Sequence, residues 1–286
     1  MTLEEIKTIG VVGAGTMGQG IAQICAQAGF KTILFDINAQ VLEKAQQIIT
    51  NNLDKGIARG KLTEVEKQAA LGNLSFTGDT LQLNCDVIIE AVVERLEVKQ
   101  DIFKELASIN KPETILASNT SSIPITQIAS AVPNPERVVG MHFFNPAHIM
   151  KLVEVISGAA TAPAVAQTVK ALAEKLGKTA VMAKDSPGFI VNRVARHFYV
   201  EGLKLLEEGV ADVETIDKLM QASGFKMGPF ELMDLIGVDT NYAVTSSMFE
   251  AFHYDAKFRP SRIQQQKVDA GHHGRKSGKG FYTYDK

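Results

Sequence analysis

The sequence predicts an α/β fold, in which a doubly wound, mostly parallel sheet is followed by an all-helical C-terminal domain. Three observations predict it. A glycine-rich turn at residues 13–18 joins an apolar run to a helical pattern. Short apolar runs then alternate with helical patterns through most of the chain. After Asp185–Gly188, almost only helical patterns remain. We therefore expect two domains, 1–186 and 187–286.

The N-terminal segment reads as a strand-turn-helix-strand unit. Ile6–Val12 is expected as a buried strand, Met17–Ala28 as a helix ended by Gly29, and Thr32–Phe35 as the second strand. Its length of about 30 residues is typical of a βαβ unit. A polar helical region follows from residue 39 to about residue 71 and is broken near Gly60, which indicates a solvated helical hairpin inserted in the first domain.

The remaining elements follow from apolar runs and helical periodicity. Five further strands are expected at Val87–Ala91, Thr114–Ala117, Val138–Phe143, Leu152–Ile156 and Thr179–Ala183, with helices at Leu96–Ile109 and Ala164–Leu176. In the second domain we expect helices at Phe189–Glu208, Val213–Ala222 and Pro229–Ile236, and a strand only at Phe281–Tyr284.

Composition excludes several classes of protein. The net charge of -2 argues against nucleic-acid binding. Residues 8–30 carry no charge and could span a membrane, but their crowded glycines and glutamines fit a strand, turn and helix better. Met1–Lys7 is not typical of a targeting peptide. Cys25 and Cys85 imply no disulfide framework, so we expect a reducing, cytoplasmic location without membrane association.

The turn carries a dinucleotide fingerprint, in which Gly13, Gly15 and Gly18 are spaced as G-x-G-x-x-G around Thr16 and Met17. The motif alone is weak evidence, but it follows a predicted strand, opens a predicted helix and precedes an acidic residue by about 20 positions. The first glycine permits the tight turn, the second lets the backbone approach a pyrophosphate, and the third lets helix and strand pack closely. A Rossmann-type site is therefore predicted.

Asp36 lies at the end of the second predicted strand and indicates which dinucleotide binds. A carboxylate there accepts the ribose hydroxyls of NAD and repels the 2′-phosphate of NADP. No Arg or Lys occurs at positions 37–40, so NAD is the predicted cofactor. The alternative is that Asp36 is only a turn residue or the N-cap of the next helix.

His142 and Glu154 are polar residues within two apolar, strand-like runs. Taken alone, His142 reads as a half-buried structural histidine, and Glu154 as a solvent-facing residue of an edge strand. A His–Glu pair would account for both, because the carboxylate would orient the imidazole and stabilise its protonated form, so that the histidine could act as a general base.

Ser118–Ser122 follows a predicted strand, so its hydroxyls and amides lie where open parallel sheets bind ligands, unless they serve plain turn chemistry. Asn192 opens the first helix of the second domain. No residues suggest a metal site.

Together these segments resemble the 3-hydroxyacyl-CoA dehydrogenase family, especially its short stand-alone bacterial members that act on 3-hydroxybutyryl-CoA. The resemblance runs from residue 10 to residue 282 and rests on GVVGAGTMGQGIAQ, AVVERLEVKQ, ASNTSSIPIT, GMHFFNPAHIMKLVEVI, KDSPGFIVNRV and GRKSGKGFY. The block around His142 and Glu154 is the most specific. The resemblance implies hydride transfer between NAD(H) and a short-chain (S)-3-hydroxyacyl-CoA. It also implies a homodimer whose helical domain binds the substrate and forms the dimer contact.

The resemblance also implies roles for single residues. His142 matches the general base and Glu154 its orienting partner, while Ser121 and Asn192 match residues that hold the substrate. Around the cofactor, the matching positions are Asp36, Glu94, Lys99, Ser121, Asn145 and Lys276. Without the resemblance, Lys99 and Lys276 would read as solvated charges.

The chain departs from the mitochondrial members in the hairpin, where a Ser and a Lys contact coenzyme A. Asn52 and Arg59 stand at those positions here, so the basic contact falls to Lys55, Arg59 or Lys61, unless all three form only a solvated face.

Two other readings stay open. The chain could oxidise a free hydroxy acid, whose carboxylate Arg193 or Arg196 would bind, or it could be a non-catalytic NAD-binding protein.

Overall fold

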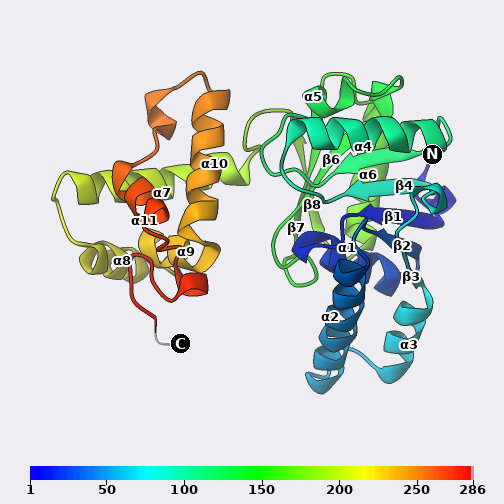
Figure 1. The fold of residues 1–286 in the computed structure, drawn as a ribbon, viewed down its shortest axis with the longest axis horizontal. Coiled ribbons are helices and arrows are strands. Elements are labelled where there is room, and N and C mark those ends of the chain that lie inside the picture. Colours follow the sequence, from blue (N-terminus) through cyan, green and yellow to red (C-terminus); the bar gives the residue numbers. More distant parts are fainter. Residues whose placement is uncertain (285–286) are drawn as a thin grey trace. The chain divides into compact units, whose positions relative to one another are not determined.

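A computed structural model describes residues 1–284 of the chain, which divides into two compact units, Met1–Phe189 and Ile190–Lys286. The first unit contains an eight-stranded sheet with helices on both of its faces, and the second is helical (Figure 1). The predicted fold class, a doubly wound, mostly parallel sheet followed by a helical C-terminal part, is confirmed.

The sheet has the strand order β3-β2-β1-β4-β5-β6-β7-β8. Its first six strands follow the order of dinucleotide-binding folds, and all neighbouring pairs are parallel except β6 and β7. The strands are β1 (Thr8–Val12), β2 (Lys31–Phe35), β3 (Leu74–Thr77), β4 (Val87–Glu90), β5 (Ile115–Ser118), β6 (Val138–Phe143), β7 (Leu152–Ser157) and β8 (Thr179–Lys184).

Two separate apolar cores lie on the two faces of this sheet. Successive strand residues alternate between them, so that Val11 belongs to one core and Val12 to the other. Helices α1 (Thr16–Gln27) and α6 (Pro163–Lys175) cover the first face, whereas α4 (Leu96–Ile109) and α5 (Ile125–Ala129) cover the second. Burial on both faces explains why the central strands read as continuous apolar runs.

The predicted hairpin consists of α2 (Ala39–Ala58) and α3 (Glu64–Gly72), which lie side by side and reach away from the sheet (Figure 1). Asn38 is the N-cap of α2 through its side-chain oxygen, and Thr63 caps α3 in a capping box with Glu66. Only one narrow stripe of α2, including Leu42, Ile49 and Leu53, is buried.

The second unit contains α7 (Val191–Glu207), α8 (Val213–Ala222), α9 (Pro229–Ile236), α10 (Val238–Ala251) and α11 (Arg262–Asp269). Its small core gathers Tyr199, Leu203, Ile216, Phe230 and Met233. At Gly202, α7 passes so close to α9 that a Cβ atom would lie 2.8 Å from Cγ of Pro229.

The expected elements were wrong at one point and incomplete at others. The tail at residues 281–284 is not a strand, since it forms only an isolated bridge between Lys279 and Thr283; the buried carboxylate of Asp234 accepts the backbone N–H groups of Phe281 and Tyr282 in place of a strand partner. The short edge strand β3 and the helices α5, α10 and α11 were not predicted.

No helix within residues 1–284 is both long and apolar enough to cross a bilayer.

Both cysteines are buried thiols. Burial raises the pKa of Cys25 and of Cys85 to about 12 in each case. They therefore remain protonated and unreactive at neutral pH.

Candidate active site

The glycine turn between β1 and α1 has the close contacts that its spacing predicts. Gly13 has φ +98°, and a Cβ atom there would lie 2.8 Å from the carbonyl oxygen of Ala91. At Gly18 a Cβ would overlap the carbonyl oxygen of Gly13, whereas at Gly15 it would meet nothing within 4 Å. The first and third glycines are thus required by the fold, and the second leaves open space at the N-terminus of α1, where amide groups favour an anion.

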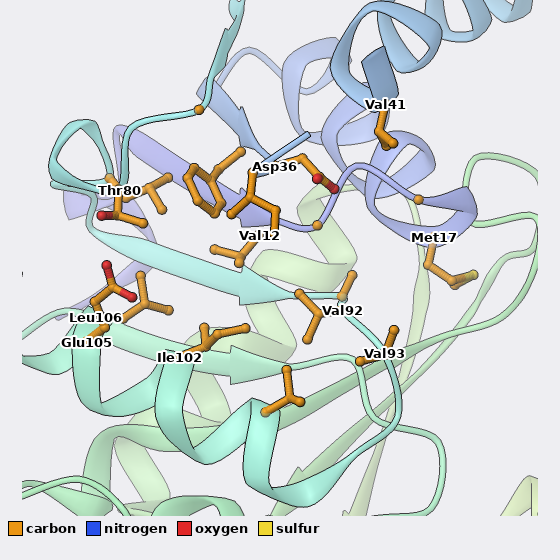
Figure 2. Close-up of a pocket in the computed structure, with 18 of the residues that line it drawn as sticks. Val12, Met17, Asp36, Val41, Thr80, Val92, Val93, Ile102, Glu105 and Leu106 are labelled. Carbon is orange, nitrogen blue, oxygen red and sulfur yellow. The ribbon is translucent and has the colours of Figure 1, made fainter. Parts of the chain in front are cut away.

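A cavity of about 750 Å³ opens at this turn and at the carboxyl ends of β1, β2 and β4 (Figure 2). Its walls are mostly apolar and include Val12, Val92, Ile102 and Leu106. Asp36 borders the cavity beside the glycine turn. The size, apolar walls and sparse polar groups suit an extended ligand with flat rings and a charged middle.

Asp36 is anchored by the backbone around it. One carboxylate oxygen accepts the N–H of Ala14 at 2.9 Å and the other the N–H of Asn38 at 3.0 Å. Asn38, and not Asp36, caps α2. These bonds fix the carboxylate at the cavity, and each oxygen has a second lone pair with which it can accept a ribose hydroxyl.

His142 and Glu154 are direct cross-strand partners in the antiparallel pair β6–β7. Nδ1 of His142 lies 2.8 Å from Oε2 of Glu154, and the two residues are 5% and 0% exposed. The ring of His142 also packs on Phe144 and Phe189, at centroid distances of 4.5 and 5.7 Å. Glu154 is thus not on an edge strand, because β7 lies between β6 and β8, and the solvent-facing alternative for it was wrong.

The loop after β5 is held by Glu94. Its Oε1 accepts hydrogen bonds from the Thr120 hydroxyl at 2.7 Å, from the Ser121 N–H at 2.8 Å and its hydroxyl at 3.1 Å, and from the Ser122 N–H at 3.1 Å. Burial raises the pKa of Glu94, but the charge of Lys99 and these hydrogen bonds outweigh it, so the pKa lies below its ordinary value. Glu94 therefore stays ionised at neutral pH.

Lys99 is buried, with 1% of its surface exposed, so the alternative that it is a solvated charge was wrong. Its ammonium lies 2.7 Å from Oε1 of Glu90 and 3.2 Å from Oε2 of Glu94. Glu90, fully buried at the end of β4, was missed by the sequence reasoning. Its one signal was an acid in an otherwise apolar strand run, the same signal that drew attention to Glu154.

The other predicted residues of the first unit are more exposed. Asn145 lies in the loop after β6. In the hairpin, Asn52 donates its amide to Oε1 of Gln23 at 3.3 Å, and Lys55, Arg59 and Lys61 are exposed along α2 and just beyond it.

Asn192 and Lys276 belong to the second unit. Asn192 is the second residue of α7, and Lys276 forms an ion pair with Asp239 at 2.7 Å.

Arg196, considered above as a carboxylate ligand, is only 2% exposed, and its guanidinium donates to Asn241 and Thr245 within the helical unit. The free-acid reading therefore keeps only Arg193.

Sequence models of known protein families match both units. The model of the 3-hydroxyacyl-CoA dehydrogenase NAD-binding domain covers residues 8–186, and that of the 3-hydroxyacyl-CoA dehydrogenase C-terminal domain covers residues 188–284. A 3-hydroxyadipyl-CoA dehydrogenase of Escherichia coli is 48% identical over 98% of this chain, which spans 59% of that protein's length. A probable 3-hydroxybutyryl-CoA dehydrogenase of Deinococcus radiodurans is 45% identical over 96% of this chain and 99% of its own.

Among solved structures, (S)-3-hydroxybutyryl-CoA dehydrogenase from Ralstonia eutropha superposes with a TM-score of 0.95 at 40% identity, covering 99% of this chain and all of that one. The similarity thus extends over both units. The chain belongs to the 3-hydroxyacyl-CoA dehydrogenase family of NAD-dependent enzymes.

Proposed function

We propose that this enzyme transfers a hydride between NAD(H) and C3 of a short-chain (S)-3-hydroxyacyl-CoA, with 3-hydroxybutyryl-CoA and acetoacetyl-CoA as the reference pair. The observation that carries the proposal is the buried 2.8 Å contact between His142 and Glu154. Relatives named for 3-hydroxybutyryl-CoA that match almost the whole chain support this choice of substrate.

In this mechanism His142 is the general base. With its Nδ1–H donated to the carboxylate of Glu154, Nε2 carries the lone pair that takes the proton from the 3-hydroxyl group. The buried carboxylate then stabilises the imidazolium. NAD+ bound at the glycine turn and Asp36 would supply the acceptor for the hydride of C3. The substrate thus loses a proton to His142 and a hydride to the cofactor, and its C3–OH becomes a carbonyl.

The other predicted residues bind and orient. Glu94 fixes the Ser121 backbone and hydroxyl, and we assign Ser121, together with Asn192, to holding the substrate. Lys55 and Arg59 are exposed cations on the hairpin and are our candidates for coenzyme A phosphate contacts, with Asn52 beside them. Asn145 and Lys276 complete the proposed cofactor contacts, whereas Lys99, predicted as a further contact, is buried in its ion pairs with Glu90 and Glu94.

The reaction is tested by mixing the enzyme with acetoacetyl-CoA and following the absorbance of NADH, with NADPH in a parallel cuvette. We expect rapid oxidation of NADH and much slower oxidation of NADPH. A preference for NADPH would refute the role of Asp36 alone. No oxidation of either would favour a free hydroxy acid as substrate, or a non-catalytic protein if no acid reacts either. A 3-oxoacyl-CoA with a terminal carboxylate should be included, because the Escherichia coli relative is named for such a thioester.

The role of His142 is tested by His142→Gln, with His148→Gln as the control because His148 is the other histidine of residues 1–189. We expect His142→Gln to lower kcat by about 10²- to 10⁴-fold while NADH still binds, because a positioned base contributes that much. Near-normal turnover in His142→Gln would contradict the assignment of His142 as the general base.

We also propose, from the family resemblance, that residues 187–286 serve the substrate and dimerisation, and that the enzyme is a cytoplasmic homodimer. Size-exclusion chromatography with light scattering would measure the assembly directly.

A further inference from the structure

Glu90 is a buried acid to which the proposed mechanism gives no task. It ends β4 and is 0% exposed. In the register of the parallel sheet it lies between Val12, the last residue of β1, and Ser118, the last residue of β5. A carboxylate is thus placed in the middle of the carboxyl edge of the sheet, where ligands bind in this fold.

One side of Glu90 holds the start of the loop at residues 118–122. The hydroxyl of Ser118 donates to Oε2 of Glu90 at 2.7 Å, and the same hydroxyl oxygen accepts the N–H of Thr120 at 3.2 Å. Ser118 and Thr120 are both 0% exposed, so no solvent competes for these bonds. The first turn of the loop is therefore set by Glu90 through a single hydroxyl.

The other side of Glu90 holds Lys99. Oε1 accepts the ammonium of Lys99 at 2.7 Å and the N–H of Val92 at 2.8 Å. A buried ammonium is stable only when it is paired. The salt bridge therefore fixes Lys99, which in turn contacts Oε2 of Glu94 at 3.2 Å. Glu94 holds the rest of the loop through Thr120, Ser121 and Ser122.

Two routes thus lead from one carboxylate to the same loop, one through Ser118 and one through Lys99 and Glu94. Glu90 and Glu94 together carry two negative charges against the one positive charge of Lys99. Replacing Glu90 by a neutral residue would leave Glu94 as the one charged partner of Lys99, so we expect the contact between Lys99 and Glu94, and with it the bonds of Glu94 to the loop, to change.

We propose that Glu90 is a positioning residue that sets the conformation of the loop Ser118–Ser122 and through it the affinity for the acyl thioester. The kinetic part rests on the proposed function, since it assumes that Ser121 holds the substrate. The structural part of the proposal, that Glu90 orders the loop, does not rest on the proposed function.

The test uses Glu90→Gln, which keeps the shape and removes the charge, and Ser118→Ala, which cuts only the first route. Glu97→Gln is the matched control, because Glu97 is an exposed glutamate at the start of α4. In Glu90→Gln we expect KM for acetoacetyl-CoA to rise about 10-fold or more, and in Ser118→Ala roughly 3- to 10-fold, as lost hydrogen bonds to a charged group would predict. Glu97→Gln should match the wild type.

Residue-resolved hydrogen exchange of the Ser121 and Ser122 amides in the ligand-free enzyme gives a second reading. We expect both amides to exchange at least about 10-fold faster in Glu90→Gln, with amides in β1 unchanged. A purely structural role would lower the fraction of folded enzyme and speed exchange throughout, but would leave KM as it is.

The outcomes separate the two proposals. If the wild-type enzyme does not reduce acetoacetyl-CoA, the proposed function fails, and the exchange rates still decide the role of Glu90. If folded Glu90→Gln and Ser118→Ala both keep wild-type exchange at Ser121 and Ser122, the proposal for Glu90 is overturned. Should Glu90→Gln not fold, Ser118→Ala decides through KM, because it cuts the first route alone, and a wild-type KM in that variant would overturn the proposal.

Discussion

The two halves of the sheet edge that form the candidate site are built by different means. At the turn between β1 and α1, the site is made by missing side chains, since a methyl group on Gly13 or Gly18 would collide with backbone. At the ends of β4, β5, β6 and β7, it is made by buried charges, with Glu90, Lys99 and Glu154 all 0–1% exposed.

Because of this difference, the two halves should respond to different kinds of substitution. The glycine turn should tolerate changes of charge nearby and respond to added volume. The charged half should tolerate little change of charge, because a buried ion that loses its partner costs more than the pair was worth. Each prediction below either strengthens this contrast or breaks it.

The largest effect is expected from Glu154→Gln in the charged half. A glutamine amide cannot stabilise the imidazolium of His142 and can present an N–H to Nδ1, which favours the wrong tautomer. We expect kcat to fall at least about 10²-fold with NADH binding retained. Steady-state kinetics would measure it, with the exposed Glu136→Gln as control. A loss under 3-fold would contradict the orienting role.

The glycine half is tested by a matched pair. Gly18→Ala should lower the free energy of unfolding by roughly 1–3 kcal/mol, because its Cβ overlaps the Gly13 carbonyl. Gly15→Ala should leave stability almost unchanged, since its Cβ meets nothing within 4 Å, yet weaken NADH binding by about 10- to 100-fold by filling the space the pyrophosphate needs. Denaturant unfolding and NADH fluorescence titration give the two numbers. Equal stability losses would refute the assigned roles.

A smaller effect is expected for Asp36→Asn, which removes a charge but little volume. The carboxylate is held by the N–H groups of Ala14 and Asn38 at the cavity. Without its charge, repulsion of a 2′-phosphate is lost, and we expect the preference for NADH over NADPH to fall about 10-fold. The ratio of kcat/KM for the two cofactors is the measurement. An unchanged ratio would place the discrimination elsewhere.

The smallest effect is on the pH dependence of stability. The pKa of Glu94 is lower in the folded chain than its ordinary value. Its contribution is therefore complete above the ordinary glutamate pKa and is lost as pH falls through the lower, folded value. Glu94→Gln should show a flatter fall of the unfolding free energy below about pH 4.5 than the wild type, measured by urea unfolding across pH. A steeper fall in Glu94→Gln than in the wild type would contradict a lowered pKa of Glu94 in the folded chain.

The glycine half could be predicted from the sequence because its physics is local. The spacing of Gly13, Gly15 and Gly18 follows from one turn, and Asp36 from the length of one βαβ unit. Sequence reasoning also paired His142 with Glu154, because two polar residues in apolar strands each required a partner.

The network of Glu90, Lys99 and Ser118 could not be read in that way. Lys99 looks solvated in an amphipathic helix, and its burial depends on which face of α4 packs on the sheet. Glu90 and Ser118 are neighbours only through the register of β4 and β5, which the sequence does not specify. The tail was misread for a similar reason, since its backbone partner is the side chain of Asp234.

The antiparallel pairing of β6 and β7 has a consequence for redesign. His142 and Glu154 face each other only in one alignment of these strands, and a slip by one residue would turn the two side chains to opposite faces of the sheet. Deleting a single residue from the connecting segment at residues 144–151 would invite such a slip. Exchanging residues one for one would leave the alignment intact. Libraries that vary the exposed Ile149 and Met150 should therefore hold the length of the segment constant.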